Sequence, residues 1–274
     1  MKSWVPKVLQ TVGGRAMIIH VLDTAMQLQP AGIHVVSNPR TPEVQAACAS
    51  FDITWARQAE QLGTGHAVQQ AMPAIPDDAD VLVMYGDIPL LEADHLQMLV
   101  DAPSAGLKVL TMEVDNPQGY GRIVRDENGS VTGIVEERDA NEKQRSITEV
   151  NSGIIMAPRT ALMSCLENMA SENSQNEYYL TDVFAIAYEL GIPTSGVVAP
   201  VPADLEGAND RIQLAALERR YRMKKATELM QAGVQLADPE RIDVRGKVDA
   251  GRDVYIDINV ILEGDIKLGD GVHI

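Results

Sequence analysis

The chain has 274 residues, of which 45% are hydrophobic and only 4% aromatic, so it can bury a sizeable core, and that core must be aliphatic. Its formal net charge of -16 and pI near 4.7 argue against a nucleic-acid polymer or an anionic membrane as partner, because both need a basic surface. There is no signal peptide and no apolar run long enough to span a bilayer, and the distant Cys48 and Cys165 predict free thiols, so we expect a cytoplasmic protein.

The first 200 residues alternate helix-like and strand-like segments. Helical spacing covers residues 18–28, 65–72, 159–169 and 181–190, and apolar strand-like runs cover residues 33–36, 81–85, 107–114, 122–124, 131–136 and 152–156. This alternation is typical of a doubly wound α/β sheet, here with some antiparallel additions. The run at 81–85 predicts a strand that is buried on both faces, as in a parallel sheet.

A carboxylate follows that strand directly. Gly86 lets the backbone turn, Asp87 stands at the carboxyl end of the strand, and Pro89 prevents further pairing. Ligands of open α/β sheets bind outside the carboxyl ends of the strands, where a carboxylate can hold a divalent cation against a phosphate. The alternative is an aspartate that merely caps a turn.

Residues 58–67 read QAEQLGTGHA, a polar, glycine-rich loop that opens a helix. Gly63 allows a ligand to approach the backbone closely, and Thr64 is expected to cap a helix whose start attracts anions. Gln58 carries an amide that can pair with a base edge. A capped helix without a ligand is the alternative, but the Tyr-Gly-Asp motif at 85–87, one helix later, favours a nucleotide.

Several later loops carry polar residues that suit a sugar. Gly121, in a Gly-Tyr-Gly-Arg turn, can offer a backbone amide, Glu136 ends a strand, and Asn151 places an amide just before another. The charges at 137–139 are expected to be a solvated run. The Gly-Tyr-Gly-Arg segment also fits a plain turn, and no single signal decides, but hydroxyls, amides and a carboxylate together indicate a sugar-binding surface.

Two more segments open helices. EYYLTD, at 177–182, leads into a helix that Thr181 or Asp182 would cap. Residues 211–232 form one long helical stretch with an apolar stripe, which is typical of a connector between two bodies. Just before it, Asn209 offers an oxygen for a metal ion, and a helix N-cap is an equally good local interpretation.

The periodicity changes after the connector. Apolar residues recur every six positions, at Val248, Val254, Val260, Ile266 and Val272, and again two places further on, at Ala250, Ile256, Leu262, Leu268 and Ile274. A hexapeptide repeat predicts a parallel β-helix, with a pair of ordinary β-hairpins as the alternative. The chain stops before two full turns of such a prism, so we expect a fragment of something longer or a natural truncation.

In this order, the motifs QAEQLGTGHA, YGD, GYGRI, NSGI, EYYLTD and EGANDR before a hexapeptide array resemble the bacterial bifunctional N-acetylglucosamine-1-phosphate uridyltransferase / glucosamine-1-phosphate acetyltransferase family. The resemblance covers essentially the whole chain, and related sugar nucleotidyltransferases do not share this combination. It implies a Rossmann-like α/β nucleotidyltransferase domain over residues 1–210, a connector helix over 211–233, and the start of a left-handed parallel β-helix over 234–274.

The resemblance also implies a reaction. The family transfers UMP from UTP to N-acetylglucosamine 1-phosphate and releases pyrophosphate. The product, UDP-N-acetylglucosamine, is a precursor of peptidoglycan and lipopolysaccharide. Full-length members are homotrimers through the β-helix, which also acetylates glucosamine 1-phosphate, and Mg²⁺ is the cofactor of the uridyltransferase half.

Individual residues are implied by the matching motifs. Asp87 and Asn209 match the Mg²⁺ ligands, and Lys7 matches the lysine that meets the phosphates, so that Lys7 and Asp87 are the catalytic pair. The nucleoside contacts match Gln58, Gly63 and Thr64, with Tyr85 and Gly86 beside them. The amino-sugar contacts match Gly121, Glu136 and Asn151, and Tyr179 and Thr181 line the same pocket.

Two departures from the family pattern qualify these roles. Family members begin with a strand and a glycine-rich loop that wraps the triphosphate, whereas this sequence has only five residues before Pro6. At the other end the β-helix stops before the acetyltransferase residues. We therefore expect a chain truncated at both ends, without acetyltransferase activity and with weakened trimerisation. A catalytically impaired sugar-nucleotide-binding module or a non-functional fragment is the alternative to an active uridyltransferase.

Overall fold

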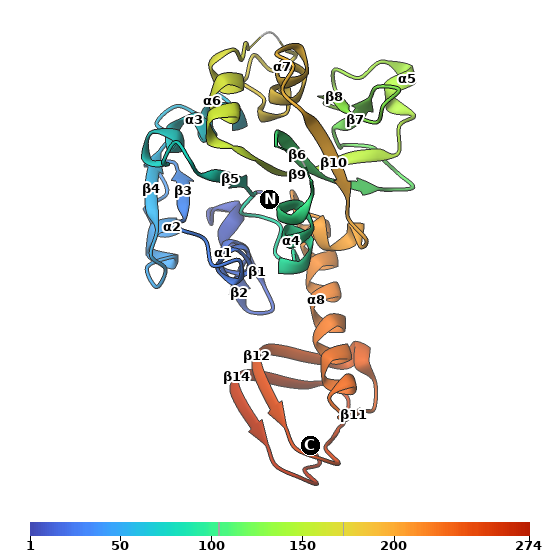
Figure 1. Cartoon of the computed structure of the whole chain (residues 1–274). Helices are drawn as coiled ribbons and strands as arrows, with labels where there is room; N and C mark the ends of the chain where they lie inside the picture. Colours follow the sequence, from blue (N-terminus) through green and yellow to red (C-terminus); the bar gives the residue numbers. More distant parts are fainter. Residues whose placement is uncertain (104, 172) are drawn as a thin grey trace. The chain divides into compact units, whose positions relative to one another are not determined.

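The computed structural model describes residues 1–103, 105–171 and 173–274, and the chain divides into two compact units, each of which is described by itself (Figure 1). The first unit is built from three separate stretches, Met1–His20, Gly86–Leu90 and Gly207–Ile274. The second unit comprises Val21–Tyr85 and Leu91–Glu206. The helical spacing at 18–28 predicts helix α1 (Met17–Gln27). Its first residues belong to the first unit and the rest to the second.

The second unit is organised around a sheet in the order β10-β6-β9-β7-β8, with β5 also on β9. Its strands are β5 (Asp80–Val83), β6 (Leu107–Glu113), β7 (Arg122–Arg125), β8 (Val131–Val135), β9 (Glu149–Pro158) and β10 (Thr194–Val198). Only β10 and β6 pair in parallel in this sheet; the other described pairs are antiparallel. A separate pair, β3 (His34–Ser37) and β4 (Thr54–Arg57), is parallel.

The prediction for the run at 81–85 was wrong in two respects. Strand β5 pairs antiparallel with β9, in the register Val81 to Ala157, and of its apolar residues only Val81 is buried, while Leu82 and Val83 are half-buried. A short apolar run predicts a strand, but it does not say how deeply the strand is buried or which way its partner runs.

Helices flank the strands of the second unit. They are α2 (Pro42–Ala47), α3 (Thr64–Ala71), α4 (Ala93–Asp101), α5 (Glu142–Arg145), α6 (Arg159–Glu167) and α7 (Val183–Glu189). Strand β6 shows how its two faces are covered: Leu107 and Val109 belong to the main core, whereas the buried Lys108 donates its Nζ to the carbonyls that end α4. Phe184 is the one aromatic side chain in that core cluster, so the predicted aliphatic core is confirmed.

The first unit contains a small hairpin, a long helix and a set of paired strands. The hairpin joins β1 (Thr11–Val12) to β2 (Arg15–Ala16), and helix α8 (Arg211–Gln231) covers the long helical stretch predicted at 211–232. At the hairpin turn Gly13 has a φ of +57°, and a Cβ there would lie 2.1 Å from the Tyr221 ring, so only glycine fits against α8.

The strands that follow α8 pair in parallel. They are β11 (Gln235–Leu236), β12 (Ile242–Ala250), β13 (Tyr255–Ile256) and β14 (Val260–Leu268), paired as β11 with β13 and β12 with β14. Ile242 is aligned with Val260 and Val248 with Ile266, so β12 and β14 are offset by 18 residues, three of the predicted six-residue periods. These described pairs are not the antiparallel pairs that two hairpins would form.

The repeat positions differ in burial. Val254, Ile256 and Leu262 are buried, most of the others pack partly buried against them, and Ile274 is 43% exposed. Both cysteines are free, as predicted; both are also buried, and burial raises the pKa of the Cys165 thiol to about 11. Within the described residues, no helix is both long and apolar enough to cross a bilayer.

Candidate functional site

Three of the predicted residues meet in the first unit. Lys7 Nζ forms an ion pair with the Asp87 carboxylate and donates to Asn209 Oδ1 at 2.5 Å. The Lys7 side chain is 36% exposed and that of Asp87 17% exposed. One ammonium therefore joins a carboxylate and an amide oxygen that stand 80 and 202 residues away from it in the sequence, as the numbering shows.

The local backbone explains how these side chains come together. Lys7 begins a single 3₁₀ turn, and a Cβ on Gly207 would lie 3.2 Å from the Asp87 carboxylate, so a residue without a side chain lets this segment approach Asp87. Asp210 caps α8 by accepting from the amides of Ile212 and Gln213. The helix-cap interpretation of Asn209 was therefore wrong, and its side-chain oxygen is directed to Lys7 instead.

The donor set of this cluster suits a hard cation. Carboxylate and amide oxygens are the groups that Mg²⁺ takes from proteins, and Mg²⁺ is usually held by one or two carboxylates together with substrate phosphates. Among the residues that the structure describes, no three His, Cys, Asp or Glu side chains are grouped to hold a metal ion. The residues present therefore fit a cation shared with a phosphate better than an all-protein cage.

The glycine-rich loop of the second unit is tied to the segment around Tyr178. Gly63 has a φ of +116°, and a Cβ there would lie 2.4 Å from the Tyr178 carbonyl, so glycine is required. The amide of Gly65 donates to that carbonyl at 2.8 Å. Thr64 does not cap α3 as predicted: Gly63 is the N-cap, and the Thr64 hydroxyl accepts from the Leu180 amide at 3.0 Å.

Gln58 is held at the base of this loop. Its amide nitrogen lies 3.1 Å from the Gly63 carbonyl and 3.1 Å from His66 Nδ1. The amide nitrogen is directed into the loop, which leaves Oε1 as the group that Gln58 offers to a ligand. A base that presents an N–H donor matches this arrangement.

A bulge in β9 shapes the Asn-Ser-Gly motif. The register of β6 and β9 shifts between Val109 and Thr111, and such bulges re-aim side chains beside functional sites. Asn151 Oδ1 accepts from the Gly153 amide at 2.8 Å, which fixes the Asn151 side chain. Gly153 has a φ of +85°, and a Cβ there would lie 2.1 Å from the Tyr85 ring, so the glycine makes room for Tyr85.

Glu136, Thr181 and Gly121 lie together. The Thr181 hydroxyl is buried and donates to Glu136 Oε1 at 3.0 Å, so neither it nor the Asp182 side chain caps α7 as predicted. A Cβ on Gly121 would lie 3.5 Å from both oxygens of the Glu136 carboxylate. Gly121 also accepts the amide of Asn151 at 2.8 Å, which links all three predicted sugar contacts.

Burial and mutual repulsion shift the acidic groups of this region. Burial raises the pKa of Glu136, the hydrogen bond from Thr181 opposes that shift, and the charge of Asp139 adds to it. The pKa of Asp182 rises to about 6, through burial first and then the charges of Glu136 and Asp139. Burial also raises the pKa of Tyr179. Functional sites are enriched in such shifted groups.

The charge run at 137–139 is only partly a solvated run. Glu137 Oε2 accepts from Arg122 Nη2 at 2.6 Å, and that guanidinium is 2% exposed. The hydrogen bond from Arg122 lowers the pKa of Glu137. Nothing in the spacing of the sequence indicated this pair. Arg122 begins β7 and Glu137 follows the end of β8, so the two side chains meet only when β7 and β8 pair.

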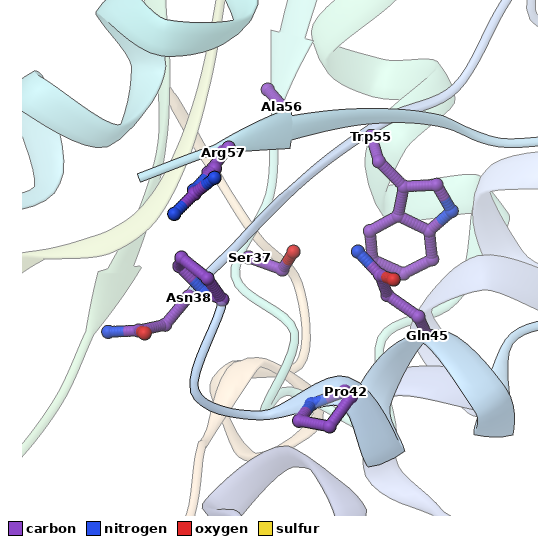
Figure 2. A pocket seen from close by; sticks show the side chains of 8 residues that line it. Ser37, Asn38, Pro42, Gln45, Trp55, Ala56 and Arg57 are labelled. Atoms are coloured by element: carbon purple, nitrogen blue, oxygen red, sulfur yellow. The ribbon is translucent and has the colours of Figure 1, made fainter. Parts of the chain in front are cut away.

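The second unit also contains a small cavity of about 270 Å³ that the sequence did not predict, lined by Ser37, Asn38, Pro39, Pro42, Gln45, Trp55, Ala56 and Arg57. It lies where the parallel strands β3 and β4 end, opposite the start of α2, and Figure 2 shows Arg57 near Asn38 at one end and Trp55 beside Gln45 at the other. None of the predicted site residues lines it, although Gln58 follows Arg57 directly. The available signal was that Trp55 and Arg57, two positions apart, share one face of a strand.

Known proteins resemble this chain in sequence. The family model for the MobA-like NTP transferase domain matches residues 1–149. The chain is 48% identical, over 274 residues, to the bifunctional protein GlmU of Alkalilimnicola ehrlichii, covering all of this chain and 59% of the relative. It is 53% identical, over 275 aligned positions, to GlmU of Xanthomonas axonopodis pv. citri, covering all of this chain and 60% of the relative. The chain thus spans about 60% of the length of these curated relatives.

One solved structure extends the comparison to the fold. A putative glucose-1-phosphate thymidylyltransferase from Bacillus anthracis, crystallised with a sucrose, superposes with a TM-score of 0.62. The alignment covers 80% of this chain and 87% of that one at 17% sequence identity. At this identity the likeness concerns the fold alone, and it agrees with the α/β architecture predicted from the sequence.

Proposed function

This chain belongs to the family of MobA-like NTP transferase domains, and we propose that it transfers UMP from UTP to N-acetylglucosamine 1-phosphate. The products are UDP-N-acetylglucosamine and pyrophosphate. The bifunctional relatives, at 48% and 53% identity along the whole chain, support this choice among nucleotidyl transfers. The observation that carries it is the meeting of Lys7, Asp87 and Asn209 on one ammonium.

The proposed reaction is an in-line displacement. A phosphate oxygen of the sugar phosphate attacks the α-phosphorus of UTP, the bond from that phosphorus to the bridging oxygen breaks, and pyrophosphate leaves. The attacking oxygen is already ionised, so no general base is needed. Catalysis of this kind rests on positioning and on cations placed against the developing charge. Lys7 is the cation that the chain itself supplies, and the Asp87 carboxylate holds it in place.

Mg²⁺ is the proposed cofactor. Asp87 and Asn209 would hold it through their side-chain oxygens, and when bound it neutralises phosphate charge. The ammonium of Lys7 stands between the same two oxygens, so its positive charge marks the position that cations favour. Lys7 is partly exposed on a flexible stem, and phosphate oxygens offer it alternative partners.

The second unit supplies the proposed specificity. Gln58 Oε1 is suited to accept the N–H at position 3 of uracil, while Gly63 and Thr64 form the backbone beside it, and Tyr85 follows strand β5. Gly86, the next residue, begins a stretch of the first unit and is also a proposed nucleoside contact. Cytosine has no N–H at that position, so Gln58 favours UTP over CTP. Gly121, Glu136 and Asn151 are the proposed contacts of the amino sugar, with Tyr179 and Thr181 lining the same region.

The remainder of the chain has a structural part in the proposal. We assign residues 1–210 to the nucleotidyltransferase domain, 211–233 to the connector helix and 234–274 to the beginning of a left-handed hexapeptide β-helix. The parallel strands with an offset of 18 residues support the last assignment. We further propose trimerisation through such a helix, and a cytoplasmic location in agreement with the two free cysteines.

The function is tested by incubating the chain with UTP, N-acetylglucosamine 1-phosphate and Mg²⁺. We expect release of pyrophosphate and formation of UDP-N-acetylglucosamine, both abolished by a chelator, and much less product with CTP. Calorimetry with UDP-N-acetylglucosamine is run beside it. Binding without turnover would favour the sugar-nucleotide-binding module, and absence of both binding and turnover would contradict the proposed function.

A further inference from the structure

Arg122 is the largest side chain in the chain's fully buried set. It begins β7 and is 2% exposed, although the interior is an expensive place for a guanidinium unless its donors are paired. The next residue on the strand, Ile123, points to the opposite face, is also 2% exposed and packs into the main core with an aliphatic side chain. An aliphatic residue at 122 would fill the space without the cost of burying a charge. The presence of an arginine at this position therefore indicates a role for its hydrogen-bond donors.

The Arg122 guanidinium bonds a backbone carbonyl and a carboxylate. Its Nη1 donates to the Tyr120 carbonyl, and its Nη2 donates to Glu137 Oε2 at 2.6 Å. The same carboxylate oxygen accepts the amide of Gly119 at 3.2 Å. Arg122 and Glu137 thus close the Gly-Tyr-Gly turn against the end of β8 with hydrogen bonds at both its first and its middle residue.

Each proposed sugar contact is one residue away from this arrangement. Gly121 directly precedes Arg122, and Glu136 directly precedes Glu137. Asn151 follows Val150, which is aligned with Arg122 in the pairing of β7 with β9. The amide of Asn151 donates to the carbonyl of Gly121 at 2.8 Å. Moving the Arg122 head group would therefore disturb all three positions together.

We propose that Arg122 is a positioning residue for the sugar phosphate, which fixes Gly121, Glu136 and Asn151 through Glu137 and the Gly-Tyr-Gly turn. Its head group is directed at the protein's own carbonyl and carboxylate, so the role is indirect. The inference rests on the proposed function, because it presumes that these three residues contact the sugar. It predicts that Arg122 governs the affinity for the sugar phosphate and leaves the affinity for UTP alone.

Arg159 provides a matched control. Like Arg122, it donates to one backbone carbonyl, of Met72, and forms one ion pair, with Asp77. In both arginines Nε is buried and has no hydrogen-bond partner among the described residues. Arg159 lies where β9 ends and α6 begins, and none of its bonds involves a predicted sugar contact. Replacing it removes a comparable set of bonds without touching the Gly-Tyr-Gly turn.

The experiment compares Arg122→Met, Arg122→Lys and Arg159→Met by steady-state kinetics and thermal unfolding. For Arg122→Met we expect KM for N-acetylglucosamine 1-phosphate to rise about tenfold, within the range that misplaced positioning groups produce. KM for UTP should stay at the wild-type value. Arg122→Lys keeps the charge but not the two-pronged guanidinium, so its KM for the sugar phosphate should lie between those of the wild type and Arg122→Met. Arg159→Met should lower the Tm without changing either KM.

A second variant covers the case in which Arg122→Met fails to fold. Glu137→Gln keeps the buried arginine and alters only a partner whose side chain is 30% exposed. It should raise KM for the sugar phosphate about threefold, since the ion pair between guanidinium and carboxylate becomes a weaker hydrogen bond from the guanidinium to a neutral amide oxygen. Unchanged KM in Glu137→Gln and in the folded Arg122 variants would overturn the proposal.

Amide hydrogen exchange separates this inference from the proposed function. The amides of Gly119 and Asn151 are the ones that the Arg122 arrangement holds. Both should exchange faster in Arg122→Met than in Arg159→Met, whatever the chain catalyses. If both amides exchange faster in Arg122→Met while the wild type makes no product, the proposed function is refuted and the positioning role stands. Equal exchange in the two variants would refute the positioning role.

Discussion

The polar residues of the first unit and those of the second are held in different ways. Lys7, Asp87 and Asn209 meet through side-chain atoms on one partly exposed ammonium, and Coulomb attraction holds them. In the second unit the amide of Gln58 and the side chain of Asn151 are each bonded to backbone groups of neighbouring residues. The first arrangement can exchange partners when a phosphate or a cation arrives, whereas the second is preorganised for one shape. The residues proposed to neutralise charge are thus held by side-chain contacts, whereas those proposed to recognise the base and the sugar are held by the backbone.

The largest effect is expected from a substitution that breaks the contacts of Lys7 in the first unit. Asp87→Asn removes the carboxylate that pairs with Lys7, and we expect turnover to fall about 1000-fold, as for other groups that stabilise developing charge. The measurement is pyrophosphate release over a range of Mg²⁺ concentrations. Asp80→Asn, at the other end of the preceding strand, should retain full activity. Metal-dependent turnover near wild type in Asp87→Asn would refute the assigned role of Asp87.

The next effect tests how strictly the second arrangement is preorganised. Gly153→Ala forces a left-handed backbone on alanine and drives a Cβ into the Tyr85 ring, so we expect a loss of about 3 kcal/mol in the free energy of unfolding. Gly129→Ala has the same φ of +85° but open space around it, and should cost only about 1 kcal/mol. Chemical denaturation measures both. Equal losses would show that the contact with Tyr85 is unimportant.

A smaller effect sharpens the role of the glycine-rich loop. Gln58→Leu removes the acceptor proposed for uracil and the bond to Gly63, and we expect KM for UTP to rise about tenfold, the equivalent of about 1.4 kcal/mol. Gln70→Leu serves as the control, because Gln70 also bonds His66 but is not a proposed contact. If both variants bind UTP as the wild type does, base recognition lies elsewhere.

The smallest effect concerns Asp182. Its pKa of about 6 lies above the ordinary 3.8, so the native state binds a proton more tightly than the unfolded chain, and stability falls as pH rises from about 4 to 6. Asp182→Asn removes this cost and should raise the free energy of unfolding at pH 7 by about 1 kcal/mol, after allowance for partial exposure. Thermal unfolding at pH 7 and pH 4 should show a gain only at the higher pH. The same gain at both values would contradict the prediction.

The helices and strands that were predicted correctly carried their own local signals. Helical spacing located α1, α3, α6 and α8 to within a residue or two, and Gly63 and Gly121 marked turns that the structure requires. The strands β4 and β10 and helix α4 were not predicted, because short mixed segments look alike until they find partners. Helix caps were also misassigned, since Asp210 and Gly63, not Asn209 and Thr64, occupy those positions.

By itself the sequence determined which chemistry the chain carries: an acidic residue after a strand, a glycine-rich loop, and a six-residue apolar period, each readable because its residues are neighbours along the chain. Only the tertiary structure decided that Lys7 lies between Asp87 and Asn209, that Arg122 is buried against Glu137, and that β12 and β14 pair in parallel. Those are contacts between residues far apart in sequence. Their energies depend on distance and burial, and neither quantity exists until the chain has folded.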